Sequence, residues 1–354
     1  MISWTGAGVS TSTGIPDFRG PNGKWTLAAR KKQRDPSLKV VNSIQAFPSP
    51  THLAIVGLLR AGYLKKLISS NCDGLHRRSG VMAPEIAELH GNGNKARCNK
   101  CHKFALLDDR VRVAAKSKEH GTNQPCPYGD CKGEMEDTII NFGEYLLPEV
   151  SRDANSKADL LLGLGSSFRV ITCDALEDVP KNGGNVVIVN LQITPYDDIC
   201  ALRIFATCDE VMDALMKKLE LPIPDWELHR WVKVTRDATG NLTVQGVDEE
   251  GNNYGWIMKA QAANVEVDPA NGRKKLVVSA EADLDTMKCF HPLQIPCSEG
   301  KPAEQLVLHC IGHRGEPPAF IPCPAGTGKA SQLHRLMLPI RRGEGPASEW
   351  KILQ

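Results

Sequence analysis

Short apolar runs alternate with amphipathic stretches along the first two-thirds of the chain. The runs at 160–164 (LLLGL) and 186–189 (VVIV), and a third that ends at Ile68, are typical of strands covered on both faces. Residues 51–61 and 208–219 have the apolar spacing of helices. This alternation predicts an α/β fold in which helices cover both faces of a doubly wound parallel sheet.

The pattern changes beyond Pro222 and Pro224, because two prolines so close together end a helix. Short β-type runs then follow one another, separated by turn sequences such as 238–241 (ATGN). We therefore expect a first domain over residues 1–224 and a mostly β C-terminal appendage of unassigned role over 225–354.

Composition fits a globular protein of about two domains, with 354 residues, 41% hydrophobic and 24% charged. The 43 basic and 41 acidic residues give a net charge of +2, so bulk charge gives no reason to expect a nucleic-acid site. No apolar run approaches the roughly 20 residues that span a bilayer, and the first residues lack secretory character. We expect a soluble intracellular chain without a membrane segment.

Four of the twelve cysteines form two close pairs, 25 positions apart. These four are Cys98, Cys101, Cys126 and Cys131. In a reducing compartment, clustered thiols are usually metal ligands rather than disulfides. Four thiolates fill the tetrahedron of a zinc ion and leave no position for a substrate, so we expect one structural zinc. The zinc module would span about 91–140, with His102 as a neighbour rather than a ligand.

A glycine-rich segment at 6–11 (GAGVST) follows the first apolar stretch. Such a strand-to-loop transition lets main-chain N–H groups approach a pyrophosphate, although a tight turn without a ligand is the simpler interpretation of the glycines alone. The third glycine of the dinucleotide fingerprint is missing, as is an acidic residue about twenty positions further on. A standard dehydrogenase is therefore disfavoured.

Several further motifs follow in a fixed order. They are 14–21 (GIPDFRGP), 70–76 (SNCDGLH), 88–91 (ELHG), the cysteine pairs, 163–167 (GLGSS) and 189–192 (VNLQ). This ordered set covers nearly all of residues 2–224 and resembles the sirtuins, which are NAD-consuming protein deacylases with a Rossmann-like sheet and a small zinc module. The sequences at 137–144 (DTIINFGE) and 189–195 (VNLQITP) are most similar to those of the nuclear class IV branch.

The resemblance implies a reaction in which the acyl oxygen of a modified lysine attacks the NAD ribose carbon. Nicotinamide leaves, and the acyl group ends on ADP-ribose while the lysine is freed. Asn71 and Asp73 would grip the nicotinamide carboxamide and the nearby ribose. His90 would be the general base, because imidazole exchanges a proton readily near neutral pH. Taken alone, a histidine before a glycine is more typical of a surface or capping residue.

The resemblance also assigns a cofactor site. Phe18 would shield the sugar carbon, and Arg19 and Trp25 would close their loop over the cofactor. The remaining cofactor residues would use main-chain amides or short polar side chains; they are Gly6, Ala7, Gly8, Thr11, Ser70, Gly165, Ser166, Ser167, Asn190, Gln192 and Cys208. For Cys208, a packed core thiol is an equally good interpretation.

A substrate cleft is implied by the same resemblance. Its expected borders are Phe142, Gly143, Glu144, Phe168 and Val170. An acylated-lysine peptide would bind there as an added strand, held mostly through its main chain, so the sequence does not name the target. The class IV likeness implies a histone-like substrate, chromatin association and a nuclear location. The segment 30–34 (RKKQR) is compatible with an import signal or with a solvated stretch.

Three features depart from the family pattern. Ser70 stands where the family usually has a glutamine that reaches the ribose, and 144–163 is shorter than in class IV relatives. The chain also begins almost at its glycine loop, without the usual upstream helix, which makes a fragment one interpretation. Two alternatives to a deacylase stay open: a protein mono-ADP-ribosyltransferase, and a catalytically weak NAD- and zinc-binding scaffold that recruits partners through its C-terminal appendage.

Overall fold

The computed structural model describes the chain in two compact units. Described are residues 1–226 except 39, 44–45, 107–109, 114–118, 127–129, 147–157 and 171–173, and beyond them the main chain of seven strands. The first unit comprises 1–93 and 138–226, and the second comprises 94–115, 119–137 and 227–354. The division into a catalytic domain over 1–224 and an appendage over 225–354 stays a prediction.

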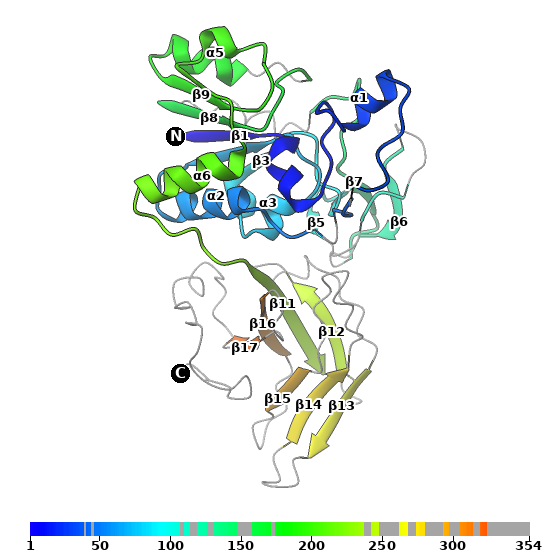
Figure 1. Ribbon diagram of the computed structural model, residues 1–354. Helices are drawn as coiled ribbons and strands as arrows, with labels where there is room; N and C mark the ends of the chain where they lie inside the picture. The colour runs from blue at the N-terminus through cyan, green and yellow to red at the C-terminus, as the bar shows by residue number, and fades with distance from the viewer. Residues whose placement is uncertain are drawn as a thin grey trace. The chain divides into compact units, whose positions relative to one another are not determined.

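The first unit is built on a six-stranded parallel sheet (Figure 1). Its strands are β1 Ile2–Thr5, β2 Lys66–Ser69, β3 Ile86–Glu88, β8 Leu160–Leu164, β9 Asn185–Val189 and β10 Leu202–Ile204. They lie in the order β10-β9-β8-β1-β2-β3, and every neighbouring pair is parallel. The chain order reverses between β1 and β8, which confirms the predicted doubly wound, Rossmann-like sheet.

Helices cover both faces of this sheet. The helices described in the first unit are α1 Lys24–Ala29, α2 Pro50–Arg60, α3 Leu75–Arg78, α5 Asp174–Lys181 and α6 Cys208–Lys218, with short 3₁₀ segments η1 Ala7–Thr13, η2 Ala83–Glu85 and η3 Asp197–Ile199. Helix α1 has no buried residue, so it is not part of this cover. Helices α2 and α6 lie side by side in Figure 1 and share one core with Leu162 and Leu164 of β8. Leu161 of the same strand belongs to a second core that includes Leu176 of α5. The continuous apolar run of β8 is therefore explained by burial on both faces.

Both long helices begin at a side-chain cap. The Ser49 hydroxyl accepts the main-chain N–H of His52 at the start of α2, and Thr207 accepts that of Glu210 at the start of α6. Capping satisfies N–H groups that have no partner within the helix. The observed bounds of α2 and α6 agree with the predicted helices over 51–61 and 208–219 to within one residue at each end.

The second unit contains antiparallel sheets. Within 94–137 the strands are β4 Lys95–Cys98, β5 Phe104–Leu106, β6 Gly121–Pro125 and β7 Glu134–Asp137, in the order β5-β4-β7-β6. Beyond residue 226 they are β11 Glu227–Arg236, β12 Leu242–Val247, β13 Ala262–Val267, β14 Lys274–Ser279, β15 Leu293–Pro296, β16 Gln305–His313 and β17 Ala319–Cys323. These seven form sheets ordered β12-β11-β16-β17 and β13-β14-β15. In the described part of the chain, none of the helices has the length and apolar character needed to cross a membrane.

Candidate active site

The loops that follow four strands of the first unit meet at one edge of its sheet. Because β1, β2, β8 and β9 are parallel, their carboxyl ends lie together. Doubly wound sheets place their ligands at this edge, beside the point where the strand order reverses. The loops carry the predicted cofactor segments 6–11, 70–73, 165–167 and 190–192. We call residues 6–11 the glycine loop.

The glycine loop packs directly on the main chain that follows β8. A Cβ on Gly6 would lie 2.6 Å from Ser166 Cα, and a Cβ on Gly8 would lie 2.6 Å from Gly165 Cα. The N–H of Gly6 donates to Leu164 O at 3.0 Å, and that of Gly8 to Gly165 O at 2.9 Å. These two amides are therefore used inside the protein, and close packing is one reason for glycine at both positions. The predicted approach of a pyrophosphate to this loop stays a prediction.

A hydroxyl group links the two residues predicted to hold the nicotinamide end. Ser10 Oγ donates to Asp73 Oδ2 at 2.6 Å and accepts from Asn71 Nδ2 at 3.3 Å. The same Asn71 amide donates to Gly6 O at 3.1 Å, and Asp73 Oδ1 accepts the N–H of Leu75 at 2.9 Å. Asn71 and Asp73 are thus held in one hydrogen-bonded group against the glycine loop.

His90 has a defined tautomer. Its Nδ1 lies 2.8 Å from Ser70 O, and because a carbonyl oxygen only accepts, Nδ1 carries the proton. The Nε2 atom then keeps its lone pair, as a general base requires. The main chain is fixed as well: Gly91 has φ +74°, and a Cβ there would lie 1.7 Å from Thr138 O. Through its bond to Ser70 O, the ring contacts the 70–73 loop at the residue that precedes Asn71.

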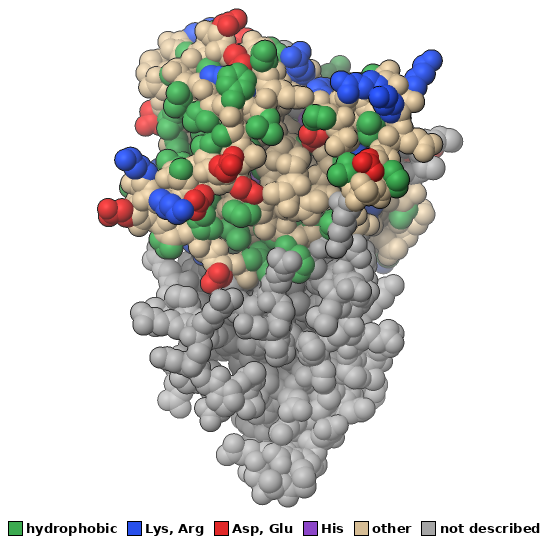
Figure 2. Space-filling model, in the orientation of Figure 1, with side chains coloured by type: hydrophobic (Ala, Val, Ile, Leu, Met, Phe, Trp, Pro, Cys, Tyr) green, Lys and Arg blue, Asp and Glu red, His purple; other side chains and the backbone are tan. Residues whose placement is uncertain are grey.

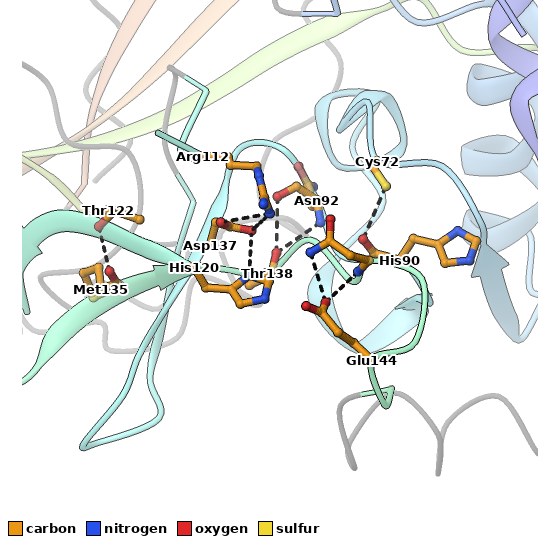
Figure 3. Close-up of polar contacts among 11 residues, drawn as sticks. Cys72, His90, Asn92, Arg112, His120, Thr122, Met135, Asp137, Thr138 and Glu144 are labelled. Carbon is orange, nitrogen blue, oxygen red and sulfur yellow. Dashed lines mark hydrogen bonds and ion pairs between the residues drawn. The ribbon is translucent and has the colours of Figure 1, made fainter. Parts of the chain in front are cut away.

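The thiol of Cys72 supports His90 from the other side. Its Sγ donates to His90 O at 3.3 Å, and Figure 3 shows the imidazole ring directed away from this contact. Burial raises the pKa of the Cys72 thiol to about 12, and the nearby Asp73 and Glu88 carboxylates add to the effect. The thiol therefore stays protonated and acts as a hydrogen-bond donor rather than as a nucleophile.

An aromatic group connects the predicted cofactor loop with the predicted substrate segment. The ring centroids of Phe18 and Trp25 are 4.8 Å apart, and those of Trp25 and Phe142 are 5.8 Å apart. The Arg19 guanidinium lies 4.3 Å from the centre of the Trp25 ring. Gln192 Nε2 donates to Arg19 O at 3.2 Å, which joins this loop to the end of β9.

Positive charge collects on this loop. Figure 2 shows basic side chains over α1, and Lys24 and residues 30–32 of the 30–34 segment are exposed. Partial burial, and then the nearby Arg169 guanidinium, lower the pKa of Arg19 from its usual value. Two neighbouring guanidinium groups repel each other and favour an anion between them.

Two predicted site residues are turned into the core. Cys208 is buried as the first residue of α6, where burial and the neighbouring Asp209 raise the pKa of its thiol to about 12. This burial fits the packed core thiol, and the predicted contact of Cys208 with the cofactor stays a prediction. Phe168 is only 6% exposed and packs edge-on against Trp4 and Tyr196 at 6.1 Å. This differs from the prediction of a cleft-lining ring, so a contact with peptide would have to come from its main chain.

The remaining predicted residues lie in loops with local partners. Ser70 Oγ accepts Trp4 Nε1 at 3.1 Å, and Asn190 Nδ2 donates to Gln192 O at 3.1 Å. Glu144 Oε2 accepts the main-chain N–H of Asn141 at 2.6 Å, which closes the turn after Phe142. Phe142 and Val170 are 76% and 39% exposed. The roles predicted for these residues, and for Ala7, Ser167 and Gly143, stay predictions.

The four paired cysteines of the second unit come together as predicted. Their sulfur atoms all lie within 4.8 Å of one another, with 3.7 Å between Cys98 and Cys131 and between Cys101 and Cys126. Sulfurs at about 2.3 Å from one zinc ion would be about 3.8 Å apart in a regular tetrahedron. A Cβ on Gly133 would lie 2.5 Å from Cys98 Sγ, so the cluster needs glycine there.

The electrostatics of this cluster also suit a metal. Burial acts to raise the pKa of Cys98, but N–H donors from Cys101 and Lys100 and hydrogen bonds from neighbouring thiols lower it to about 6. A thiol of lowered pKa gives up its proton readily to a cation. Cys98, Cys101, Cys126 and Cys131 thus fit one tetrahedral zinc ion.

Comparison with known proteins identifies the family. A model of the Sir2 family matches residues 35–172. The chain is 38% identical over 268 residues to the NAD-dependent protein deacetylase SRT1 of Arabidopsis thaliana, covering 75% of this chain and 54% of that protein. It is 35% identical over 242 residues to the NAD-dependent protein deacetylase Sirt6 of Drosophila melanogaster, covering 64% and 73%. The chain belongs to the Sir2 family, the sirtuins.

The relatives of this sirtuin include the predicted branch. The NAD-dependent protein deacetylase sirtuin-7 of Bos taurus is 38% identical over 244 residues, which cover 65% of this chain and 59% of that protein. This similarity supports the class IV resemblance. The chain spans a little over half the length of SRT1 and of sirtuin-7.

Two polar residues of this sirtuin's site escaped the sequence analysis. Ser10 joins Asn71 to Asp73, whereas the predicted Thr11 is exposed and donates to Gly8 O within its own loop. The two hydroxyl residues are neighbours, and only the rotation of the 3₁₀ segment decides which faces inward. The other is Arg203 of β10, which donates to Gln192 O and so supports the 190–192 loop; no motif marks it.

Proposed function

We propose that this sirtuin is an NAD-dependent protein-lysine deacylase. The observation that carries the proposal is the hydrogen bond from His90 Nδ1 to Ser70 O. It leaves Nε2 free as a base beside the loop that holds Asn71 and Asp73. The relatives SRT1, sirtuin-7 and Sirt6 are each named NAD-dependent protein deacetylase.

The residues present fit a dinucleotide at this edge of the sheet. Arg19 and Arg169 supply neighbouring positive charges of the kind that suits a pyrophosphate. Bound NAD would supply the ribose carbon to which the acyl oxygen of a modified lysine is transferred as nicotinamide leaves. Asn71 and Asp73 would orient the nicotinamide end, and Phe18 and Trp25 would exclude water from it.

His90 would act after the acyl group has reached the sugar. Its Nε2 lone pair would accept a ribose hydroxyl proton, while the bond from Nδ1 to Ser70 O holds the ring in the tautomer that this step needs. Cys98, Cys101, Cys126 and Cys131 would hold zinc in a purely structural role, because four thiolates leave no ligand position open.

For the substrate, we propose an acylated lysine in a histone or another nuclear protein, with chromatin association and a nuclear location. Support comes from the similarity to sirtuin-7 and SRT1. The exposed Phe142 and Val170 would border an extended peptide that binds through its main chain.

The test is a product assay with NAD and an acetylated histone-tail peptide. The proposal predicts release of nicotinamide with formation of acetyl-ADP-ribose and free lysine. ADP-ribose attached to protein would instead indicate a mono-ADP-ribosyltransferase, and no release of nicotinamide would indicate a binding scaffold; either result overturns the proposal. His90→Ala should abolish product without loss of bound zinc. The matched control is His102→Asn, because His102 is exposed with φ +60°, a conformation that asparagine tolerates.

A further inference from the structure

Two histidines lie buried beneath the glycine loop, and the proposed chemistry uses neither. His52 is in the first turn of α2 and is 0% exposed, and His76 is in α3 and is 3% exposed. Their ring centres are 4.5 Å apart, with an interplanar angle of 47°. Each ring has one bonded nitrogen. The second ring nitrogen, which is Nε2 in His52 and Nδ1 in His76, has no hydrogen-bond partner among the described residues.

The tautomer of His52 follows from its bonded nitrogen. The main-chain N–H of Ser49 donates to His52 Nδ1 at 3.2 Å, and Ser49 Oγ lies 2.7 Å from the same nitrogen. A main-chain N–H only donates, so Nδ1 presents its lone pair. In the neutral ring the proton is then on Nε2, and the unpaired atom of His52 is a donor.

His76 adopts the same Nε2-protonated tautomer as His52, but its bonded and unpaired nitrogens are exchanged. Its Nε2 lies 2.8 Å from Thr5 Oγ1, whose own proton has Ile68 O as acceptor at 3.5 Å. The Thr5 oxygen is thus available to accept a hydrogen bond from Nε2–H. Nδ1 then carries a lone pair, so the unpaired atom of His76 is an acceptor, and the neighbouring His52 ring holds an unpaired donor.

We propose that His52 and His76 form a neutral hydrogen-bonded pair, with His52 Nε2–H donating to His76 Nδ1, that positions the glycine loop for the dinucleotide. The torsion about the Cβ–Cγ bond of histidine is soft, so a small rotation of either ring aligns the donor with the acceptor. Two buried polar atoms that would otherwise each lose hydration are satisfied by the one bond. The functional half of this inference rests on the proposed function.

The outer contacts of the pair reach both sides of the glycine loop. One member contacts Thr5, which directly precedes Gly6. The other is bonded to Ser49, whose Oγ lies 2.9 Å from Val9 O. A bond between the two rings would therefore link the beginning of the loop to its middle.

The surroundings keep both rings uncharged at working pH. Burial lowers the pKa of His52 to about 3, and the Arg78 guanidinium adds to this. Burial and then His52 lower the pKa of His76 to about 3, against the opposing effect of the Asp73 and Glu88 carboxylates. When both rings are neutral, His52 Nε2–H can donate to the lone pair of His76 Nδ1. A protonated His76 would have no lone pair on Nδ1 to accept this bond.

Four substitutions separate the bond within the pair from the outer contacts. Asparagine mimics Nδ1 and glutamine mimics Nε2. His52→Asn keeps the acceptor for Ser49 and loses the donor to the pair; His76→Gln keeps the contact with Thr5 and loses the acceptor. His52→Gln and His76→Asn are the matched controls. His52→Gln retains the donor at Nε2 and loses the contact with Ser49, and His76→Asn retains the acceptor at Nδ1 and loses the contact with Thr5.

The decisive readout is a double-mutant cycle on NAD binding by calorimetry, together with steady-state kinetics. His52→Asn and His76→Gln should each weaken NAD binding by about threefold to tenfold, the range of one buried hydrogen bond, with kcat at saturating NAD changed less than about twofold. The double variant should be no weaker than the worse single variant. The proposal is overturned if the losses of NAD affinity in the two single variants multiply in the double variant, or if both single variants bind NAD as tightly as wild type.

A measurement on the unaltered protein covers the case in which a variant does not fold. Long-range proton–nitrogen NMR on histidine-labelled wild type should show protonated Nε2 and bare Nδ1 in both rings at neutral pH. Protonated Nδ1 in either ring, or a charged ring, would refute the inference. If wild type binds no NAD, the proposed function fails by itself, and the pair is then judged by these tautomers and by the same cycle on melting temperature.

Discussion

The Ser10 hydroxyl offers the sharpest test of how the candidate site is held together. It donates to Asp73 Oδ2 at 2.6 Å and accepts from Asn71 Nδ2 at 3.3 Å, and the residue is only 1% exposed. Ser10→Ala removes both contacts with little room for water to replace them. One oxygen of Asp73 then has no donor among the residues that the structure describes, and Asn71 loses one of its two acceptors in the loop.

The size of the effect follows from the kinds of bond lost. A hydrogen bond to a carboxylate contributes about 1.5–3 kcal/mol, and a neutral one about 1 kcal/mol. We expect Ser10→Ala to lower the free energy of unfolding by about 2–3 kcal/mol. Because Asn71 and Asp73 are the residues proposed to orient the nicotinamide end, kcat/KM for NAD should fall by about tenfold to a hundredfold, at about 1.4 kcal/mol for each factor of ten.

The assay combines denaturant unfolding with steady-state kinetics in which NAD is varied. Ser3→Ala is the matched control, because Ser3 is also 1% exposed and its hydroxyl donates to Leu162 O at 3.0 Å within the sheet. That variant should lose about 1 kcal/mol of stability with kcat/KM for NAD changed less than about twofold. If Ser10→Ala has the same kinetics as Ser3→Ala, Ser10 does not organise the site and the reasoning is refuted.

Three further predictions concern packing, the metal and a thiol. Phe168→Ala should lower the free energy of unfolding by about 3–5 kcal/mol in a denaturant titration, whereas Val170→Ala should change it by less than about 0.5 kcal/mol; equal losses would contradict the burial of Phe168. Cys101→Ser should lose the bound zinc, as measured by atomic absorption. It should also increase proteolysis within 94–137, because metal binding and folding are coupled. Zinc retained at one ion per chain would exclude the four-thiolate site. In the native protein Cys72 should resist iodoacetamide at pH 8, as followed by peptide mass spectrometry, since burial raises the pKa of its thiol to about 12. Rapid alkylation would show that the thiol is not held as a protonated hydrogen-bond donor.

Much of the scaffold could be predicted because the responsible signals are local. The run 160–164 is apolar at every position except its glycine, and β8 is indeed buried on both faces of the sheet. Close cysteine pairs likewise predict a cluster, since four soft ligands with two short loops have few other uses. The resemblance to sirtuins then supplied the order of the loops, which the parallel sheet brings to one edge.

The details that sequence did not predict depend on side-chain direction in the folded chain. Ser10 rather than Thr11 faces Asp73, which only the rotation of η1 determines. Phe168 turns inward against Trp4, although its neighbours suggested an open cleft. The glycines of the loop are required by contact with main chain about 160 positions away, and no short motif records such a contact.

The account's central claim is that the acyl oxygen of an acylated lysine side chain attacks a ribose carbon of NAD beside His90. It is tested most directly with a histone-tail peptide whose acetyl carbonyl oxygen is labelled with oxygen-18, incubated with NAD and followed by mass spectrometry. The account predicts that the label appears in acetyl-ADP-ribose, bonded to the sugar. Label recovered only in free acetate, with no labelled nucleotide, would contradict it.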